Sequence, residues 1–287
     1  MSDDERNDRH NTGTLEMIID PDKFTIIAGP CVLEGYDMAI DIATQMAYIC
    51  NKLGFNYIFK GSFDKANRTS IHSFRGLPFE KSMDIFRAIR KNGIATTTDV
   101  HETYQIKELV GVIDIIQIPA LLCRQTDLLL DAADYFDYIN IKKGQFASPK
   151  TMSCAAEKIY QYTDGEVKCV LLTERGTTFG YNDLVVDMRS INAMRLFCDF
   201  VLFDATHSCQ KPGDSVTGGD SSQLKTLTKC AIVSGAHGIF FETCPIPSSA
   251  KSDAGTQMPL DYAERFIKEA IVPYITRGFN YHENYIV

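Results

Sequence analysis

The chain has 287 residues, of which 45% are hydrophobic and 23% are charged. This composition can fill the core of a large globular domain and excludes a coiled coil or a disordered polymer. With 29 Lys and Arg against 37 Asp and Glu, the formal net charge is −8, which argues against a protein that coats nucleic acid or an anionic membrane. Any anion that the protein binds must therefore meet a local cluster of cations.

No apolar run approaches the roughly 20 residues that a bilayer-spanning helix needs. Residues 1–13 are polar and do not resemble a signal peptide. We therefore expect a cytoplasmic protein with a flexible polar tail over residues 1–14 and a single catalytic domain over 15–287. The nine cysteines are odd in number and include no C-x-x-C pair, which favours reduced thiols over a disulfide framework.

Eight short apolar runs recur along the chain at the spacing of β/α units. In chain order they cover residues 24–28, 57–60, 94–98, 113–118, 138–142, 168–172, 200–203 and 238–241. Segments with helical periodicity lie between and after them, at 37–53, 80–91, 102–110, 126–133, 149–162, 187–197, 222–234 and 260–275. Eight alternations within about 250 residues predict a (β/α)8 TIM barrel.

The strand runs are continuously hydrophobic, which indicates burial on both faces, as in a parallel sheet. An open, doubly wound sheet satisfies the same pattern and is the alternative to the barrel. Residues 15–19 could add a strand or hairpin that plugs the bottom of the barrel.

Polar residues follow the apolar runs, and in a barrel the carboxyl ends of the strands surround the active-site mouth. Six cations are expected there: Lys60, Lys65, Arg68, Arg124, Lys142 and Arg175. In a chain of net charge −8 such a cluster is costly unless anions occupy it, so it predicts a substrate with several phosphate or carboxylate groups. The alternative is that these residues only rim the barrel and pair with nearby carboxylates.

A second group combines one thiol, one imidazole and two carboxylates, namely Cys31, His207, Glu242 and Asp253. They follow the first, seventh and eighth strands, which are neighbours in a closed barrel. Mixed S, N and O donors suit one divalent ion such as Fe2+, Zn2+, Mn2+ or Co2+. A buried cysteine and a single histidine are also common as packing residues, so the spacing alone leaves both interpretations open.

Longer motifs connect these groups to a known family. They are IAGPCVLE at 27–34, FKGSFDKANRTSIHSFRG at 59–76, TDVHE at 98–102, IIQIPALLCRQTDLL at 115–129, INIKKGQF at 139–146, TERGTTFGYNDLVVDMRS at 173–190, FDATHS at 203–208 and SDA at 252–254. In order and without large gaps, they resemble the 3-deoxy-D-manno-octulosonate 8-phosphate (KDO8P) synthases over residues 24–275.

The resemblance implies a cytoplasmic transferase that condenses phosphoenolpyruvate with D-arabinose 5-phosphate and water, giving KDO8P and phosphate for lipopolysaccharide biosynthesis. By the resemblance, Lys142 and Arg175 hold the phosphoenolpyruvate phosphate, and Lys60 and Lys65 lie near its carboxylate and the reacting carbons. Asn67 and Arg68 match positions that hold arabinose 5-phosphate, whose phosphate end a neighbouring subunit can reach. Thr69, Gln117, Ala120 and Arg124 are further expected substrate-binding residues of the same mouth, and Asp99 matches a polar group near the reacting centre. Cys31 and His207 join Lys60, Lys65 and Asp99 as expected catalytic residues.

The family divides on the residue after Gly-Pro in the first strand's loop, and Cys31 matches the metal-dependent branch, with His207, Glu242 and Asp253 as the other ligands. The chain departs from the family pattern at Thr69, where Ser is common, and at Cys244, where His is usual. Family members are commonly homotetramers. The Gly-rich residues 209–220 read as a mobile lid or as an ordinary surface loop.

Two other functions remain open at this stage. The sibling synthase that makes 3-deoxy-D-arabino-heptulosonate 7-phosphate from erythrose 4-phosphate shares the barrel and the metal set, but it usually carries KPR(T/S)S where this chain has KANRTS. A phosphosugar-binding barrel without catalysis is the second alternative. Phosphate release with each sugar, with and without a chelator, separates the three.

Overall fold

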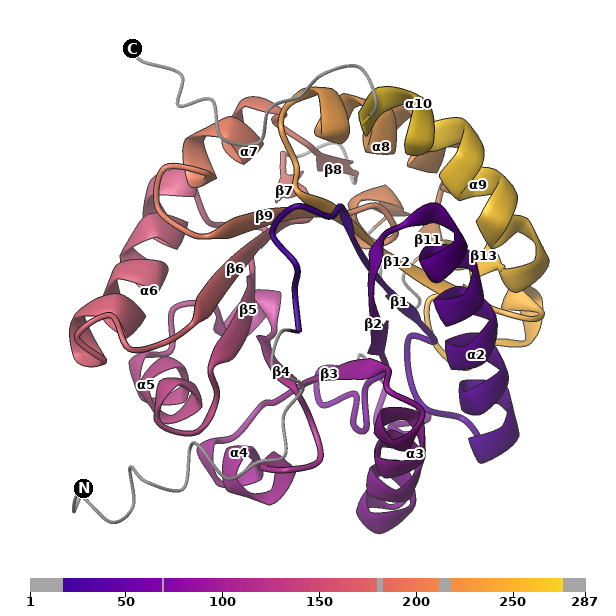
Figure 1. Ribbon diagram of the computed structural model, residues 1–287, viewed down its shortest axis with the longest axis horizontal. Coiled ribbons are helices and arrows are strands. Elements are labelled where there is room, and N and C mark those ends of the chain that lie inside the picture. The colour runs from indigo at the N-terminus through magenta and orange to yellow at the C-terminus, as the bar shows by residue number, and fades with distance from the viewer. Residues whose placement is uncertain (1–17, 69, 180–182, 212–217, 276–287) are drawn as a thin grey trace.

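The computed structural model describes residues 18–68, 70–179, 183–211 and 218–275, and all structural statements below concern these residues. Eight parallel strands form a closed ring with helices on its outside (Figure 1). The strands are β1 (Thr25–Gly29), β2 (Asn56–Lys60), β3 (Ala95–Asp99), β4 (Ile115–Ile118), β5 (Tyr138–Lys142), β6 (Cys169–Glu174), β9 (Phe200–Asp204) and β12 (Gly238–Cys244). The ring closes where β1 pairs in parallel with β12, with Thr25 opposite Gly238. The predicted (β/α)8 barrel is confirmed.

The helices alternate with the strands as the hydrophobic periodicity predicts. They are α2 (Tyr36–Leu53), α3 (Phe79–Lys91), α4 (Thr103–Leu109), α5 (Thr126–Tyr135), α6 (Pro149–Tyr162), α7 (Arg189–Met194), α8 (Leu224–Val233), α9 (Ala263–Ala270) and α10 (Val272–Ile275). The segment predicted as one helix over 260–275 consists of a 3-10 turn followed by α9 and α10. Pro273 explains the break, because proline has no N–H to bond to the preceding turn.

Two apolar layers hold the barrel together. The larger layer lies between the strands and the helices, and Phe241 of β12 packs there edge-on against Phe266 of α9, with ring centroids 5.5 Å apart. The smaller layer fills the barrel interior with residues of alternate register, such as Ile27, Leu171 and Phe240. Side chains along each strand therefore point alternately inward and toward the helices.

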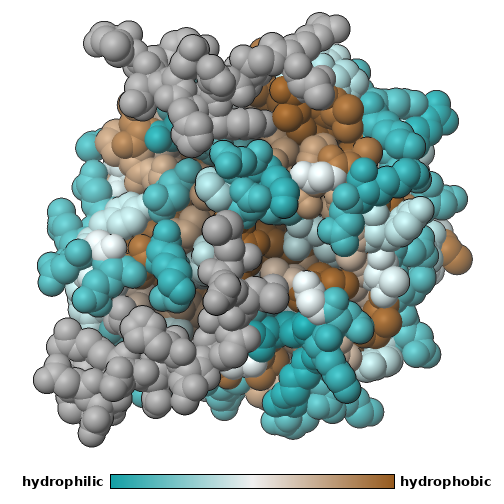
Figure 2. Space-filling view, in the orientation of Figure 1, coloured by the Kyte–Doolittle hydropathy of each residue, from teal (hydrophilic) through white to brown (hydrophobic). Residues whose placement is uncertain are grey.

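Ile18 and Ile19 are buried with this interior layer, although they are not in a strand. The rest of the extra strand predicted over 15–19 lies outside the described residues. In Figure 1 the indigo start of the described chain crosses the ring, and Figure 2 shows apolar and polar side chains mixed across the same face. The two isoleucines therefore act as the expected plug, without strand pairing.

Short strand pairs project from the carboxyl ends of the barrel strands. β7 (Thr177–Thr178) pairs with β8 (Leu184–Val185), and β10 (Gln210–Lys211) pairs with β11 (Gly218–Gly219). β13 (Met258–Pro259) extends the sheet beside β12. The described ends of the predicted lid over 209–220 are thus held as an antiparallel pair, and residues 212–217 lie outside the described part. The predicted tail over 1–14 also lies outside it. Among the described helices, none combines the length and apolar character needed to cross a bilayer.

Candidate active site

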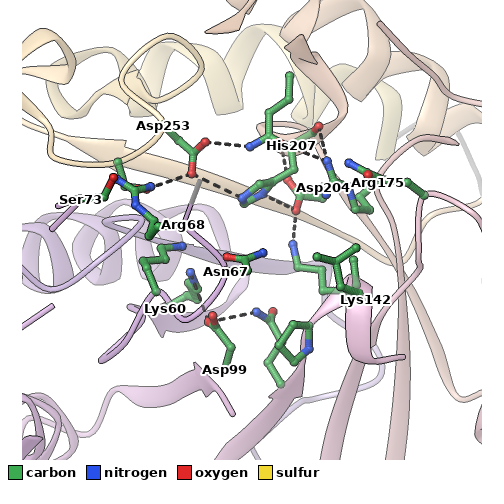
Figure 3. A pocket seen from close by; sticks show the side chains of 18 of the residues that line it. Lys60, Asn67, Arg68, Ser73, Asp99, Lys142, Arg175, Asp204, His207 and Asp253 are labelled. Carbon is green, nitrogen blue, oxygen red and sulfur yellow. Dashed lines mark hydrogen bonds and ion pairs between the residues drawn. The ribbon is translucent and has the colours of Figure 1, made fainter. Parts of the chain in front are cut away.

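A cavity of about 740 Å³ lies at the carboxyl ends of the strands. Most of the predicted site residues line it, and Figure 3 shows their side chains converging from several strands. Those that line it are Lys60, Lys65, Asn67, Arg68, Asp99, Gln117, Ala120, Lys142, Arg175, His207 and Asp253. Cys31 and Glu242 are fully buried next to it. Arg124 is exposed outside the lining, and Thr69 lies outside the described residues.

Lys60 is buried at the end of β2 between two carboxylates. Its Nζ lies 3.5 Å from Asp99 Oδ1 and 3.6 Å from Glu242 Oε1, and it donates to Ser62 Oγ at 2.9 Å. Burial alone would raise the pKa of Asp99, but Lys60 and Lys65 outweigh it and hold that pKa well below the usual range. Asp99 is therefore an ionised hydrogen-bond acceptor beside two cations.

A chain of hydrogen bonds across the barrel interior fixes the amide of Gln117. Gln117 Nε2 faces Asp99 Oδ1 at 3.4 Å, Asn140 Nδ2 donates to Gln117 Oε1 at 3.1 Å, and Thr173 Oγ1 donates to Asn140 Oδ1 at 2.7 Å. An ionised Asp99 can only accept a hydrogen bond, so the N–H₂ group of Gln117 must face it. The donors of Asn140 and Thr173 then point the same way along the series. The side chain of Gln117 is thus fixed with its N–H₂ toward Asp99 and its oxygen toward Asn140, which leaves one N–H and one lone pair for a further partner.

Lys142 and Arg175 stand at the ends of β5 and β6 and point into the cavity (Figure 3). Burial lowers the pKa of Lys142 to about 8, although its partner Asp204 acts in the opposite direction. Arg175 donates from Nη2 to the His207 carbonyl at 3.0 Å and to Gln210 Oε1 at 2.8 Å. Two buried cations with a shared opening form a site suited to phosphate.

Asp204 connects this pair of cations with His207. Its Oδ2 accepts from Lys142 Nζ and from His207 Nδ1, the latter at 2.7 Å, and its Oδ1 accepts from the His207 backbone N–H at 2.8 Å. Burial would raise the pKa of Asp204, but the charges of His207 and Lys142 lower it strongly. This ionised carboxylate accepts the hydrogen bond from His207 Nδ1, which fixes the ring so that Nε2 faces Glu242 and Asp253.

The predicted metal ligands come together beside Asp204. The donor atoms of Cys31, Glu242 and Asp253 all lie within 4.8 Å of one another. His207 Nε2 is 3.6 Å from Glu242 Oε1 and 3.9 Å from Asp253 Oδ2. These strand ends are far apart in sequence, and the closure of the ring makes them neighbours.

Two features of these four residues fit a bound cation. Glu242 is fully buried, and neither of its carboxylate oxygens has a hydrogen-bond partner among the described residues. Lys60 Nζ lies 3.6 Å from Oε1, beyond hydrogen-bond distance, so both oxygens keep lone pairs for a bound cation. Asp253 adopts φ 49°, a left-handed conformation that is strained for aspartate and frequent at ligand sites. Gln210 Nε2 donates a hydrogen bond to Asp253 Oδ1 at 2.7 Å. The donor set of thiol, imidazole and carboxylates suits a divalent transition metal.

Asp204 and Gln210 have roles in the site that the sequence patterns did not predict. The D-A-T-H spacing carries a usable signal for Asp204, because an aspartate three residues before a ligand histidine can reach its Nδ1. Gln210 has no such signal.

Burial raises the pKa of Cys244 to about 11, and this thiol packs in the outer apolar layer with only 4% exposure.

The fold and this cavity define a (β/α)8-barrel enzyme whose mouth is built for anions. The profile of the DAHP synthetase I family matches residues 10–271. The chain is 46% identical over 252 residues to the 2-dehydro-3-deoxyphosphooctonate aldolase of Fusobacterium nucleatum, covering 87% of this chain and 90% of that protein. Proteins of the same name from a Cyanothece species and from Haemophilus ducreyi are 44% and 43% identical, over 88% and 90% of this chain and 92% and 90% of theirs. The chain belongs to the DAHP synthetase I family and, within it, to the 2-dehydro-3-deoxyphosphooctonate aldolases, the KDO8P synthases.

Proposed function

We propose that this chain condenses phosphoenolpyruvate with D-arabinose 5-phosphate and water to give KDO8P and inorganic phosphate. The observation that carries the proposal is the cavity, in which Lys60, Lys65, Lys142 and Arg175 converge in a chain of net charge −8. Two phosphates and one carboxylate are the anions that such a cluster accommodates. The names of the relatives support the same reaction.

In the proposed reaction, C3 of phosphoenolpyruvate forms a bond to the aldehyde carbon of the sugar. Water adds at C2, and the C2–O bond to phosphate breaks. The water oxygen becomes the C2 carbonyl oxygen of the product. Of the two protons of that water, one goes to the aldehyde oxygen and the other to the departing phosphate, so that atoms and protons balance.

Lys142 and Arg175 bind the phosphoenolpyruvate phosphate, and Lys60 and Lys65 bind its carboxylate. Fixed cations at these positions stabilise charge on the departing phosphate and cost no reorganisation during the reaction. Asp99, held ionised, keeps Lys60 in place through the Ser62 hydroxyl, which donates to the carboxylate at 2.9 Å. The two substrates are thereby held with their reacting carbons side by side, which supplies much of the rate enhancement.

Asn67 and Arg68 are proposed to bind arabinose 5-phosphate, with Thr69, Gln117, Ala120 and Arg124 as further contacts. Arg68 Nη1 donates to Ser252 Oγ at 2.7 Å, which joins the loop after β2 to the loop that carries Asp253. Gln117 contributes one N–H donor. Arg124 is exposed and outside the cavity lining, and we propose that it reaches the sugar phosphate of a neighbouring subunit in a homotetramer.

The proposal includes one divalent ion held by Cys31, His207, Glu242 and Asp253, with Fe2+, Zn2+, Mn2+ and Co2+ as candidates. When bound, it would act as a Lewis acid that polarises the aldehyde or activates water. Asp204 would hold His207 Nε2 toward it, and Gln210 would hold Asp253. The buried carboxylate of Glu242, whose oxygens have no hydrogen-bond partner among the described residues, is the observation that supports this part of the proposal. A cytoplasmic location and a role in lipopolysaccharide biosynthesis complete it.

Phosphate release from phosphoenolpyruvate tests the proposal. Release with arabinose 5-phosphate and none with erythrose 4-phosphate is expected, and a chelator should abolish it until the metal is restored. Release with erythrose 4-phosphate alone would indicate the heptulosonate synthase, and no release with either sugar would indicate a binding protein. Light scattering measures whether the chain is a tetramer.

A further inference from the structure

Lys143 and Glu174 form a buried ion pair that the proposed reaction does not use. Each is 1% exposed, and Lys143 Nζ lies 3.4 Å from Glu174 Oε1. Because side chains alternate across the barrel wall, Lys142 and Arg175 point into the cavity while Lys143 and Glu174 point outward. Each inward cation therefore has an outward charged residue as its chain neighbour.

Glu174 holds the backbone turn that carries Arg175. Its Oε1 accepts from the backbone N–H groups of Arg175 at 3.1 Å and Gly176 at 2.7 Å, and its Oε2 accepts from Ser190 Oγ. Gly176 has φ 89°, which places the turn in a conformation that only glycine adopts without strain. The carboxylate thus fixes this turn from outside the barrel and anchors it to α7.

Lys143 ties the same turn to the loop after β5. It donates to Thr177 Oγ1 at 2.9 Å and to the Ala147 carbonyl at 3.3 Å. That loop carries Gln145, whose side-chain oxygen can face both terminal guanidinium nitrogens of Arg175 at 3.2 Å. Lys143 therefore joins the turn that carries Arg175 to the loop whose Gln145 faces the Arg175 guanidinium.

We propose that Lys143 and Glu174 are positioning residues that hold the Arg175 guanidinium at its place in the phosphate site. The inference rests on the proposed function, since it takes the phosphoenolpyruvate phosphate as the ligand of Arg175. A buried ion pair is weak as a device for stability alone, because an apolar pair of similar volume is often as stable. The contacts of this pair are instead concentrated on the backbone and neighbours of Arg175.

Two double variants isolate the contribution of the Glu174 oxygen. Lys143→Met with Glu174→Met removes both charges and the acceptor, whereas Lys143→Met with Glu174→Gln removes both charges and keeps an acceptor oxygen. Neither leaves an unpaired buried charge. The measurements are the Kd of phosphoenolpyruvate for the full-length, metal-loaded chain by calorimetry, and the KM for each substrate.

We expect the variant with two methionines to bind phosphoenolpyruvate at least tenfold more weakly than the wild type, with less than a twofold change in the KM for arabinose 5-phosphate. The double variant that contains Glu174→Gln should lose clearly less affinity, because it keeps the acceptor oxygen. In an Arg175→Ala background, both double variants should cause no further loss, since they act through that guanidinium. Ser190→Ala, which removes one hydroxyl, provides a milder test and should weaken binding in the same direction.

A partly buried ion pair at the other end of the barrel provides the control. Arg90 Nη2 lies 2.9 Å from Asp114 Oδ1, and Arg90→Met with Asp114→Asn should lower stability without changing the Kd of phosphoenolpyruvate. Wild-type affinity in the variant with two methionines and in Ser190→Ala, or an equal loss in the Arg175→Ala background, would overturn the inference alone. A wild-type chain that does not bind phosphoenolpyruvate would overturn the proposed function as well.

Discussion

Replacing Asp204 with Asn tests whether this carboxylate holds His207 and Lys142 in their working positions. Asp204 is fully buried and accepts from both side chains. The substitution preserves size but removes the charge and turns one oxygen into an N–H₂ group, which cannot accept a hydrogen bond. Either the His207 backbone N–H or the Lys142 and His207 side chains therefore lose their acceptor. The uncompensated Lys142 ammonium is then stranded beside Arg175.

The magnitude follows from the hydrogen bonds that Asp204 accepts. It accepts from Lys142 Nζ and, at 2.7 Å, from His207 Nδ1, and a hydrogen bond to a charged group contributes about 1.5–3 kcal/mol. Removing one partner of a buried pair costs about 3–5 kcal/mol, which corresponds to a fall in Tm of about 10 °C for a domain of this size. Loss of the group that orients a ligand histidine typically lowers metal affinity or activity about 10- to 100-fold.

The assay combines calorimetric unfolding, metal titration of the stripped protein, and kcat/KM for phosphoenolpyruvate. Asp114→Asn is the matched control, because Asp114 is 3% exposed and accepts from Arg90 and from the Thr96 backbone N–H at the opposite end of the barrel. It should lower Tm comparably and leave metal affinity unchanged. Unchanged metal affinity and kcat/KM in Asp204→Asn would refute the reasoning, and so would an equal loss of metal affinity in Asp114→Asn.

Three further predictions concern single residues. Cys31→Ala should lose bound metal, measured by elemental analysis, and phosphate release; activity retained by a metal-free variant would contradict a catalytic metal. Lys142 has a folded-state pKa of about 8 against an ordinary 10.5, so between these values the unfolded chain holds one more proton at this residue, and its contribution to stability rises with pH. Over the same window the ammonium that binds phosphate is lost, so the Kd of phosphoenolpyruvate should increase above pH 8; a Kd constant to pH 10 would exclude the assignment. Phe266→Ala removes a fully buried ring that packs against Phe241. It should lower the free energy of unfolding, measured by calorimetry, by about 3–5 kcal/mol and leave the KM values within twofold. A larger change in KM would show that this layer is coupled to the mouth.

The sequence was sufficient for the alternation of eight strands and helices, because hydrophobic runs and helical periodicity are local properties of the chain. The run over 138–142 agrees with β5 at both ends, whereas the run over 113–118 overshoots β4 by two residues. Asp114 explains that difference: its side chain accepts from the Thr96 N–H and from Arg90, a tertiary contact that no local pattern contains. Motifs such as KANRTS and DATHS also identified the family, since they retain its residue types at fixed spacing.

Only the tertiary structure decided how these residues act on one another. Ring closure places the donor atoms of Cys31, Glu242 and Asp253 within 4.8 Å of one another, although Cys31 and Asp253 are 222 residues apart in sequence. A linear pattern contains no such distance. The same closure makes Asp204 the link between Lys142 and His207. The alternation of side chains across the wall separates Lys142, which faces the cavity, from Lys143, which is buried behind it. The two adjacent lysines look equivalent in sequence and differ only because the sheet has an inside and an outside.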